Sequence, residues 1–406
     1  MRILLVHHNF PGQFVHLAAG LQQRGHDVTA FASSTFFRPS PVKVVRYRLD
    51  ERRFDLGTFG LAAHYADQTW RGQAVARTAA KLRSESGYVP DVIFGHSGWG
   101  ETLFLREVWP EARMLVYAEF FCRVRGLDVD FDPEFQKPTL ESDLWVKARQ
   151  ASQLVAMSEV EKVLAPTKWQ ASSYPDHLCS RIRVIHEGID TDLAKPSESA
   201  SVQMPGMNGP IRCGDEILTF VARTLEPYRG YHTFMRALPR VLAERKNAQV
   251  IIVGGDVGGY GIQPPPGTTW KQKFLDEVKD RIDLSRVHFV GVLPYEQFIE
   301  LMRITRVHAY LTYPFVLSWS MLEAMSAGAL VVASRTPPVE EVMKDGINGL
   351  LIDFFDVDTW SDVLIRALAE IDRYRDIRVG ARRTIVDSYD LRTNCLPKQI
   401  EFVEKP

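Results

Sequence analysis

Cysteine is scarce in this sequence and follows no pattern. Only four cysteines occur among 406 residues, with no C-x-x-C pair and no nearby pair of histidines. Their spacing argues against a disulfide framework and against a zinc site, and it predicts reduced thiols in a cytoplasmic protein. The four are Cys122, Cys179, Cys213 and Cys395.

The chain also lacks a long apolar run and an excess of charge of either sign. No window approaches the roughly 18 uninterrupted apolar residues that cross a membrane. The apolar run at residues 3–6 is too short for the core of a signal peptide. Lysine and arginine number 49 against 50 aspartates and glutamates, so no basic field is available for non-specific nucleic-acid binding and no nucleic-acid partner is expected.

Strand and helix patterns alternate along the chain. The strand-length apolar runs include residues 3–6, 28–32, 91–94 and 114–117 and, later, 218–222, 250–253, 307–311 and 330–333. Segments with helical spacing separate them. This alternation predicts an α/β fold of two doubly wound domains in tandem, each with a parallel sheet covered on both faces.

The domain boundary is predicted from composition. A length of 406 residues suits two or three domains of ~150 residues each. Residues 195–215 are rich in proline, serine and glycine without periodicity, and we interpret them as the linker. We therefore expect a first domain over residues 1–195 and a second over 196–389.

The loops at the carboxyl ends of the strands are the candidates for chemistry, because open parallel sheets bind ligands there. In residues 313–328 a helix is predicted to begin near Trp319. The amides of that helix start, beside Ser318 and Ser320, suit a phosphate group, and Glu323 could accept hydrogen bonds from a ribose diol. A serine-capped helix with one solvated glutamate is the competing explanation.

Two arginines follow a buried strand of the second domain. Arg223 and Arg229 are separated by a turn that contains proline and glycine, and guanidinium groups placed in this way can converge on one diphosphate. Two solvated surface arginines are the alternative. The nearby loop Val257–Thr269 could be a lid over the site or a solvated excursion.

Polar residues also follow strands of the first domain. Gly12 and Gln13 lie in a loop where a substrate could approach the backbone, although the G-x-G-x-x-G pattern is absent. His96 stands near glycines at a strand end and could hydrogen-bond a polar substrate or be structural. His8 and Glu119 are candidates for contact with an acceptor, and for Glu119 a capped or salt-bridged carboxylate is the alternative.

Taken together, these segments resemble the retaining glycosyltransferases of family 4, which have the GT-B fold of two facing Rossmann-like domains. The similarity covers nearly the whole chain and is strongest over residues 218–353. The segments and the family elements they resemble are 220–230 ("VGR…EKG"), 250–255 ("LxIVGxG"), 287–294 ("VxFxGxVP"), 322–328 ("LEAMAxG"), 345–351 ("DGxNGLLV") and 188–192 ("NGVDxxxF").

The resemblance implies roles for particular residues. The second domain would bind a nucleotide-sugar donor: Arg223 and Arg229 would clamp its diphosphate, with Arg229 where lysine is usual. Glu323 would bind the ribose, and the backbone near Leu293 would meet the base. The first domain would bind the acceptor, with His96 near the sugar, and the C-terminal segment 390–406 would complete that domain.

One position departs from the family pattern. The E-x7-E motif would place its first glutamate at position 315, where this chain has Phe315. That glutamate normally holds a hydroxyl of the donor sugar, so its loss leaves the nucleotide site intact and the sugar open. A bacterial sub-branch with PFVLSWS in place of EGFGLxx is similar in this respect.

The function implied is retaining transfer from a nucleoside-diphosphate sugar, UDP favoured and GDP next, to a hydroxyl of a glycan, a lipid-linked glycan or a small molecule. A front-face route would use the departing phosphate as the base, with Arg223, Arg229 and the amides near residues 318–320 stabilising its charge. No metal and no cofactor are expected, because no D-x-D occurs in the donor-site segments. A GT-B nucleotide-sugar epimerase and a non-catalytic sugar-nucleotide-binding protein are the alternatives.

Two small basic clusters are candidates for contact with a membrane surface. Arg52 with Arg53, and Lys81 with Arg83, could touch anionic lipid at the inner membrane face, although solvated faces are the simpler explanation. The sequence does not indicate an oligomeric state.

Overall fold

The computed structural model describes residues 1–50, 55–207 and 209–405, so Arg52 and Arg53 lie outside the described residues. The chain divides into two compact units. Unit 1 comprises residues 1–130, 136–188 and the C-terminal residues from Arg392; unit 2 comprises 131–135 and 189–391. The division falls after Gly188, rather than after residue 195, and the C-terminal segment is part of unit 1.

Unit 1 is built on a seven-stranded sheet in the order β3-β2-β1-β4-β5-β6-β7. Every pair of neighbouring strands is parallel, with Ile3 opposite Val28 on one side and Val92 on the other. Alternate residues of β1 enter different cores: Ile3 and Leu5 pack on one face, Leu4 and Val6 on the other. The strands are β1 (Arg2–Val6), β2 (Asp27–Ser33), β3 (Lys43–Tyr47), β4 (Val92–His96), β5 (Arg113–Tyr117), β6 (Lys162–Ala165) and β7 (Ile182–Val184).

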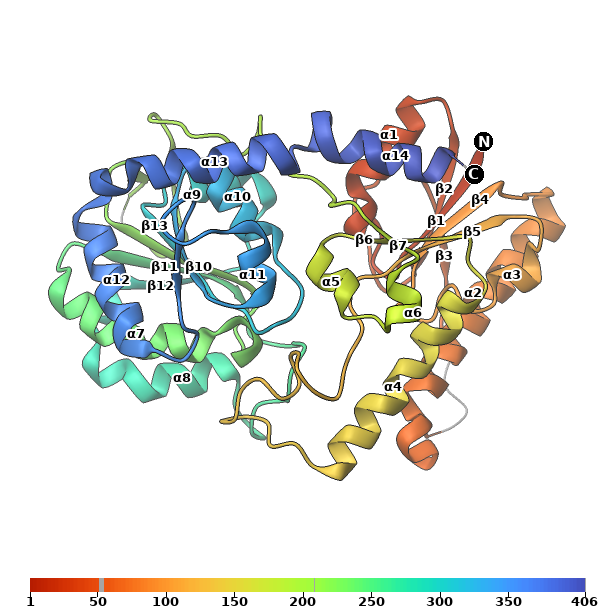
Figure 1. Ribbon diagram of the computed structural model, residues 1–406, viewed down its shortest axis with the longest axis horizontal. Helices are drawn as coiled ribbons and strands as arrows, with labels where there is room; N and C mark the ends of the chain where they lie inside the picture. The colour runs from red at the N-terminus through yellow and green to blue at the C-terminus, as the bar shows by residue number, and fades with distance from the viewer. Residues whose placement is uncertain (51–54, 208, 406) are drawn as a thin grey trace. The chain divides into compact units, whose positions relative to one another are not determined.

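Helices cover both faces of this sheet, and the C-terminal helix lies beside the first one (Figure 1). Leu396 and Ile400 pack against the same core as the N-terminal strand, and they approach Gly20 so closely that a Cβ there would lie 3.0–3.2 Å from their methyl groups. The helices of unit 1 are α1 (Val15–Gln23), α2 (Ala63–Ser86), α3 (Leu105–Val108), α4 (Leu140–Ser158), α5 (Lys168–Ser172), α6 (Asp176–Cys179) and α14 (Leu396–Glu404).

Unit 2 is built on a six-stranded parallel sheet in the order β12-β11-β10-β13-β14-β15. Its strands are β10 (Ile217–Thr224), β11 (Gln249–Gly255), β12 (Val287–Gly291), β13 (Val307–Tyr310), β14 (Leu330–Ser334) and β15 (Leu350–Ile352). Its helices are α7 (Tyr231–Glu244), α8 (Trp270–Val278), α9 (Tyr295–Ile304), α10 (Trp319–Ala327), α11 (Pro337–Val342), α12 (Val357–Ala369) and α13 (Arg375–Tyr389). Helices α7, α8 and α12 lie on one face of the sheet, and α9, α10 and α13 on the other (Figure 1).

The predicted linker over residues 195–215 is wrong. This segment contains the short strands β8 (Ser201–Val202) and β9 (Ile211–Arg212), which pair antiparallel. Val202, Met204 and Ile211 are buried in the core of unit 2. A few apolar residues among turn formers are therefore enough to fix the segment, because they are buried in the core of unit 2 and β8 packs against α9.

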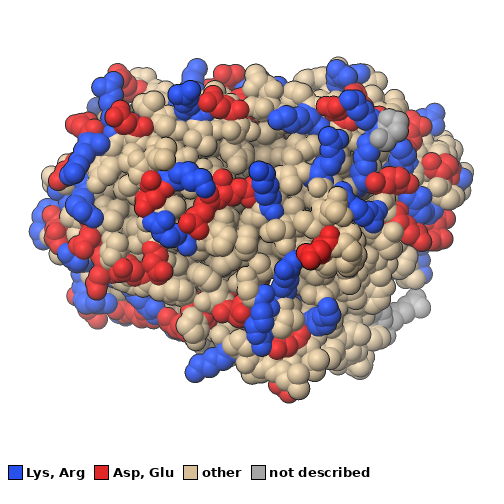
Figure 2. Space-filling model, in the orientation of Figure 1, with Lys and Arg blue, Asp and Glu red and all other residues tan. Residues whose placement is uncertain are grey.

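No helix in the described part of the chain is long and apolar enough to cross a membrane. Basic and acidic side chains are interspersed on the face shown in Figure 2, as the formal charge of −1 leads one to expect.

A five-residue piece of the first half of the chain belongs to unit 2. Residues 131–135, here called the inserted segment, lie between β5 and α4 in sequence but pack among side chains of unit 2. Asp132 is 2% exposed and accepts hydrogen bonds from the Tyr313 hydroxyl (2.6 Å) and from Nε2 of His232 (3.2 Å). Glu134 forms a bidentate pair with Arg236, at 2.7 Å for each bond.

We expect Asp132→Ala to destabilise the protein, because it leaves the buried Tyr313 hydroxyl and His232 ring without their acceptor. An unsatisfied buried polar group costs about 1–3 kcal/mol, so the calorimetric unfolding temperature should fall by several degrees. The control is Asp130→Ala, whose carboxylate accepts from the exposed amide of Gly126. Equal unfolding temperatures for the two variants would show that Asp132 does not anchor the inserted segment.

Candidate functional site

The candidate residues fall into two groups, one in each unit. All of them lie at or just beyond the carboxyl ends of parallel strands, or at the start of the helix that follows. Unit 1 carries His8, Gly12, Gln13, His96 and Glu119, and unit 2 carries Arg223, Arg229, Leu293, Ser318, Trp319, Ser320 and Glu323.

Arg229 connects the turn after β10 to the loop after β13. Its guanidinium donates to Oγ1 of Thr312 (2.9 Å) and to the carbonyl of Val316 (2.8 Å). The same group lies over the rings of Tyr260 and Phe315, 5.7 and 5.6 Å from their centroids. Phe315 therefore offers Arg229 a π face where the family pattern has a carboxylate.

The positive charges of Arg223 and Arg229 are not neutralised by an ion pair with any residue that the structure describes. Glu226, which lies between them in sequence, instead accepts from the amides of Tyr260 (2.9 Å) and Gly261 (3.3 Å). Burial raises the pKa of Glu226, although those amides and the two arginines oppose the rise. Two guanidinium groups are thus available to an anion such as a diphosphate.

Loop Val257–Thr269 is held at two points. The amides of Tyr260 and Gly261 are bound by Glu226, and Nε1 of Trp270 donates to the carbonyl of Ile262 (3.1 Å). The Tyr260 hydroxyl lies 3.5 Å from Nη1 of Arg223. The loop therefore brings an aromatic ring beside both arginines; its movement as a lid stays a prediction.

Helix α10 begins at Trp319, as predicted, and ends at Gly328 in the left-handed conformation (φ 89°). Ser318 is its N-cap and accepts from the amide of Ser320 at 3.4 Å. The amide of Ser318 donates to the Tyr310 hydroxyl (2.9 Å), which ties the helix start to the end of β13. The serine cap is therefore present, as the competing explanation has it, and phosphate binding at this helix start stays a prediction.

Glu323 is a buried carboxylate, 4% exposed, in the second turn of α10. The hydroxyl of Tyr295, the first residue of α9, donates to its Oε1 at 2.8 Å. Burial raises the pKa of Glu323 to about 7, against the smaller lowering by the hydrogen bond from Tyr295. Sequence reasoning missed Tyr295, whose signal was a tyrosine two positions after Leu293 at the start of a helix.

The raised pKa makes the contribution of Glu323 to stability depend on pH. The folded protein holds this proton more tightly than the unfolded chain does, so the contribution is complete below about pH 4.5 and is lost as the pH rises through 7. The loss approaches about 3 kcal/mol.

We therefore expect the difference in free energy of unfolding, Glu323→Gln minus wild type, to become more positive as the pH rises from 4.5 through 7, measured in denaturant titrations. The control is Glu296→Gln, at an exposed position on the same helix as Tyr295, for which this difference should not change with pH. If the difference for Glu323→Gln also stayed constant, the raised pKa of Glu323 would be contradicted.

In unit 1, Gln13 joins His7 to Glu119, and Glu119 in turn lies beside His96. Gln13 Oε1 lies 2.6 Å from Nε2 of His7, and its Nε2 donates to Oε1 of Glu119 at 2.6 Å. The second carboxylate oxygen of Glu119 lies 3.3 Å from Nε2 of His96. Three predicted residues therefore meet in one group, and His7, which sequence reasoning did not single out, supports it.

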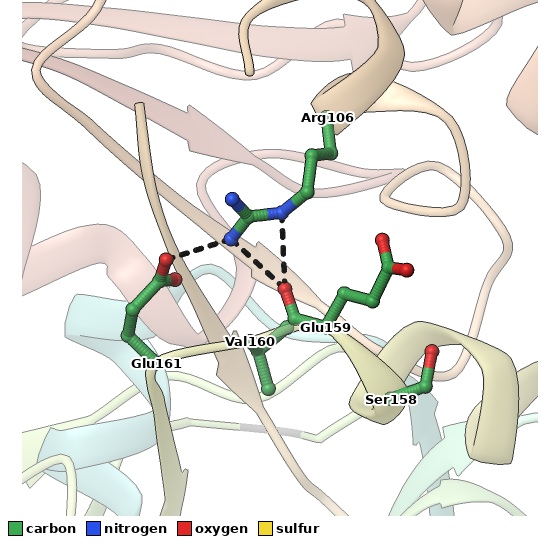
Figure 3. Close-up of a pocket in the computed structure, with 5 residues that line it drawn as sticks. All are labelled: Arg106, Ser158, Glu159, Val160 and Glu161. Carbon is green, nitrogen blue, oxygen red and sulfur yellow. Dashed lines mark hydrogen bonds and ion pairs between the residues drawn. The ribbon is translucent and has the colours of Figure 1, made fainter. Parts of the chain in front are cut away.

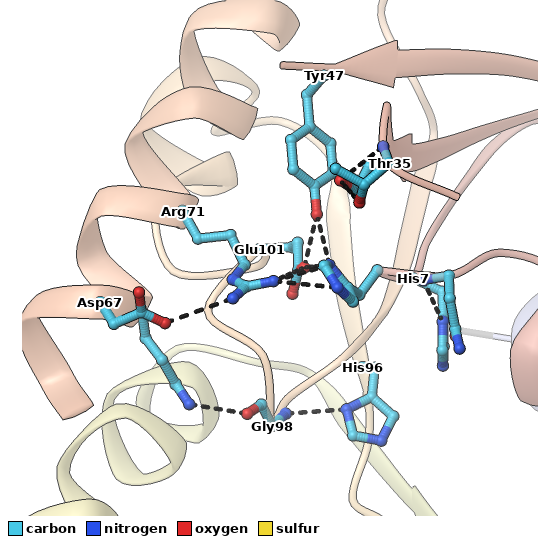
Figure 4. A network of polar contacts seen from close by, with 12 residues as sticks. His7, Thr35, Tyr47, Asp67, Arg71, His96, Gly98 and Glu101 are labelled. Carbon is cyan, nitrogen blue, oxygen red and sulfur yellow. Dashed lines mark hydrogen bonds and ion pairs between the residues drawn. The ribbon is translucent and has the colours of Figure 1, made fainter. Parts of the chain in front are cut away.

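His8 belongs to a neighbouring network, whose members Tyr47, Arg71 and Glu101 are labelled in Figure 4. Its Nδ1 lies 2.8 Å from Nη1 of Arg71 and 3.3 Å from Oε1 of Glu101. Glu101 is 1% exposed and also accepts from the Tyr47 hydroxyl at 2.7 Å. The ring of His8 is stacked on that of Trp99, whose other neighbour is His96.

The structure itself requires glycine at position 12, apart from the substrate approach that was predicted there. Its φ is +48°, and a Cβ on it would lie 2.5–2.8 Å from three ring atoms of His7. The glycine is therefore needed for the imidazole of His7 to reach Gln13, whatever substrate approaches this loop.

An open pocket elsewhere on unit 1 is not part of this arrangement (Figure 3). Arg106 donates there to the carbonyl of Glu159 (2.9 Å) and to the carboxylate of Glu161 (2.7 Å). Glu161 directly precedes β6, so the pocket lies at the amino end of that strand, away from the edge where ligands bind.

No group of three or more His, Cys, Asp or Glu residues within 1–50, 55–207 and 209–405 could hold a metal ion. The expectation of a metal-independent protein stays a prediction.

Two family models match the chain. One, the glycosyl transferase family 4 group, matches residues 24–194, and the other, glycosyl transferases group 1, matches residues 209–384. Between them they match most of both units.

Curated relatives match over most of their length. The D-inositol 3-phosphate glycosyltransferase of Mycolicibacterium smegmatis is 26% identical over 86% of this chain and 76% of its own. The protein of the same name from Nocardia farcinica is 25% identical, with coverages of 90% and 77%.

Solved structures share the fold. Sucrose-phosphate synthase from Thermosynechococcus elongatus has a TM-score of 0.72 at 16% identity and covers 99% of this chain and 98% of its own. HepE of Anabaena in complex with UDP and glucose has a TM-score of 0.67 at 15% identity, with full coverage of both chains. These are GT-B glycosyltransferases, so the fold is two parallel-sheet α/β domains of the GT-B class.

Proposed function

We propose that this chain, which belongs to the glycosyltransferases of family 4 and group 1, moves a sugar from a nucleoside diphosphate to a hydroxyl of an acceptor. We further propose that the configuration at the anomeric carbon is retained. UDP is the nucleotide we favour, supported by the UDP complex of the structural neighbour HepE, and GDP is the next candidate.

The observation that carries this proposal is the grouping of the donor candidates within unit 2. Two guanidinium groups without an ion-pair partner among the described residues suit a diphosphate, and the buried carboxylate of Glu323 suits a ribose diol. The start of α10 adds the partial positive charge of a helix N-terminus, beside the hydroxyl groups of Ser318 and Ser320. Leu293, two residues before Tyr295, would place backbone beside the base.

In the reaction we propose, the bond between the anomeric carbon and the diphosphate oxygen breaks, and the acceptor oxygen bonds to that carbon on the same face. The acceptor proton passes to the departing phosphate oxygen. Arg223 and Arg229 stabilise the negative charge that develops on the diphosphate, which is electrostatic catalysis by groups already in place. No metal is needed for these steps.

The acceptor is a hydroxyl compound bound by unit 1. The name of the curated relatives makes D-inositol 3-phosphate, a small phosphorylated polyol, the first acceptor to test. Glycans and lipid-linked glycans are the next classes. Phe315 supports a second candidate, a sugar-nucleotide-binding protein without turnover, because an aromatic ring cannot accept a hydrogen bond from a sugar hydroxyl as a carboxylate does.

Thermal stability with nucleoside diphosphates tests the donor site. At millimolar ligand a micromolar site adds ~4 kcal/mol of stability, so we expect one of UDP, GDP and ADP to raise the unfolding temperature by several degrees. Arg223→Ala and Glu323→Gln should abolish this rise, whereas Arg240→Ala, whose side chain pairs with Glu244 on the surface, should keep it.

Release of the nucleoside diphosphate from its sugar then separates the two candidates. Turnover with D-inositol 3-phosphate supports the transferase, and binding without turnover of any donor supports the binding protein. No stabilisation by any of the three nucleotides would contradict the donor site.

Nucleotide affinity should depend on pH through Glu323. A protonated carboxyl uses one oxygen as a donor and accepts more weakly than a carboxylate, so the affinity for the ribose diol should rise as the pH rises through about 7. Tyr295→Phe removes the hydrogen bond that lowers the pKa of Glu323, so the rise should move to higher pH in calorimetric titrations. A pH profile identical to that of wild type would show that Tyr295 does not act on this carboxylate.

A further inference from the structure

The inserted segment binds a loop of the candidate donor site. Asp132 Oδ2 accepts at 2.6 Å from the hydroxyl of Tyr313, which lies three residues beyond the end of β13. Arg229 donates to Oγ1 of Thr312, directly before Tyr313, and to the carbonyl of Val316, three residues after it. Tyr313 is therefore flanked in sequence by the two groups that hold the guanidinium of Arg229.

Tyr313 also joins this loop to the turn that carries Arg229. Its amide donates to the carbonyl of Tyr228 at 2.9 Å, and the two rings lie 4.7 Å apart. Tyr228 directly precedes Arg229 in the chain. The ring of Phe315, over which the guanidinium of Arg229 lies, is 5.6 Å from the ring of Tyr228. Because packed side chains transmit strain, a shift of Tyr313 would move both the backbone and the guanidinium of Arg229.

Asp132 binds Tyr313 as a charged acceptor. Burial acts to raise the pKa of Asp132, but the hydrogen bonds from His232 and Tyr313 lower it, so this buried carboxyl is an anion. Burial and the neighbouring carboxylate raise the pKa of Tyr313 well above its ordinary value, so the hydroxyl keeps its proton and donates it. A hydrogen bond to an ionised acceptor is about twice as strong as one between neutral groups. The bond therefore holds Tyr313 more firmly than an ordinary hydrogen bond would.

Aromatic packing fixes the inserted segment on both sides of Asp132. The ring of Phe131 lies 5.0 Å from that of Tyr313, and the ring of Phe135 lies 5.3 Å from that of Trp270. The chain directly before and directly after the segment belongs to unit 1. A loop that holds the donor arginine of unit 2 is thus bound by a carboxylate that the first half of the chain supplies.

We propose that Asp132 is a positioning residue for the donor site, which acts through Tyr313 to hold the loop after β13 so that Arg229 faces the diphosphate. This role rests on the proposed transferase function. Asp132 acts on the donor only through the hydroxyl of Tyr313 and the partners of Arg229. Glu134, in the same segment, pairs instead with Arg236 on α7, and it therefore provides a matched control.

Two substitutions of almost unchanged shape, alone and combined, test this role. Tyr313→Phe removes the hydroxyl and keeps the ring, and Asp132→Asn removes the charge of its acceptor. Each should weaken UDP in calorimetric titrations by roughly 2- to 30-fold, the range for residues that change binding without touching the ligand. Because Asp132 acts through the hydroxyl, the double variant should bind UDP no more weakly than Tyr313→Phe alone. Glu134→Gln should leave the affinity unchanged.

A segment that only anchors the fold would give a different result. Equal UDP affinities of Tyr313→Phe and wild type would overturn the proposal. So would losses from the two substitutions that multiply in the double variant, because independent effects are additive in free energy. GDP and ADP are titrated in parallel with UDP. If the wild type binds none of the three nucleotides, the proposed function fails instead.

Hydrogen–deuterium exchange tests the hold on the loop without any nucleotide. The amide of Tyr313 is protected by its bond to the carbonyl of Tyr228, so peptides that cover residues 311–318 report the state of the loop. We expect Asp132→Asn to speed exchange in these peptides and Glu134→Gln to leave it at the wild-type rate. Unchanged exchange in Asp132→Asn would overturn the proposal. An equal acceleration in the peptides of β11 would mark a general loosening of unit 2 and would overturn it as well.

Discussion

All strands of the two large sheets run parallel, and the rest of the structure depends on that constraint. Parallel strands end at the same edge of their sheet, so the loops that follow them collect there. In unit 1 this edge carries the loop after β1, the end of β4 and the residue pair after β5, which bring Gln13, His96 and Glu119 together. In unit 2 the turn after β10 meets the loop after β13 at Arg229, and α10, which follows that loop, carries Glu323.

The two buried glutamates show how local donors decide the chemistry of one residue type. Glu119 accepts from Gln13 and lies beside two imidazoles, so its pKa is lowered despite burial. Glu323 has one neutral donor, Tyr295, and burial raises its pKa to about 7. The first is an anion throughout the physiological range, and the second changes its charge within it.

Much of the fold was readable from periodicity. A segment with helical spacing was predicted between the apolar runs 218–222 and 250–253, and α7 (Tyr231–Glu244) lies there; α10 begins at Trp319, as predicted. The inserted segment 131–135 could not be predicted, because its packing on unit 2 depends on contacts between residues about 100 positions apart. The same limit applies to the partners of Glu323 and Glu119. Their positions could be predicted from the sequence, but the hydrogen bonds that Tyr295 donates to Glu323 and Gln13 donates to Glu119 depend on three-dimensional proximity.

The central claim is that unit 2 holds a nucleotide-sugar donor through Arg229 and that the chain transfers the sugar with retention. The most direct measurement is proton NMR of the products formed from UDP-glucose and GDP-mannose, separately, with D-inositol 3-phosphate present. The account predicts that wild-type protein releases the diphosphate from one of them and gives an α-linked product, and that Arg229→Ala does so at least 100-fold more slowly, an effect of ~3 kcal/mol. A β-linked product, or equal turnover by Arg229→Ala, would contradict it.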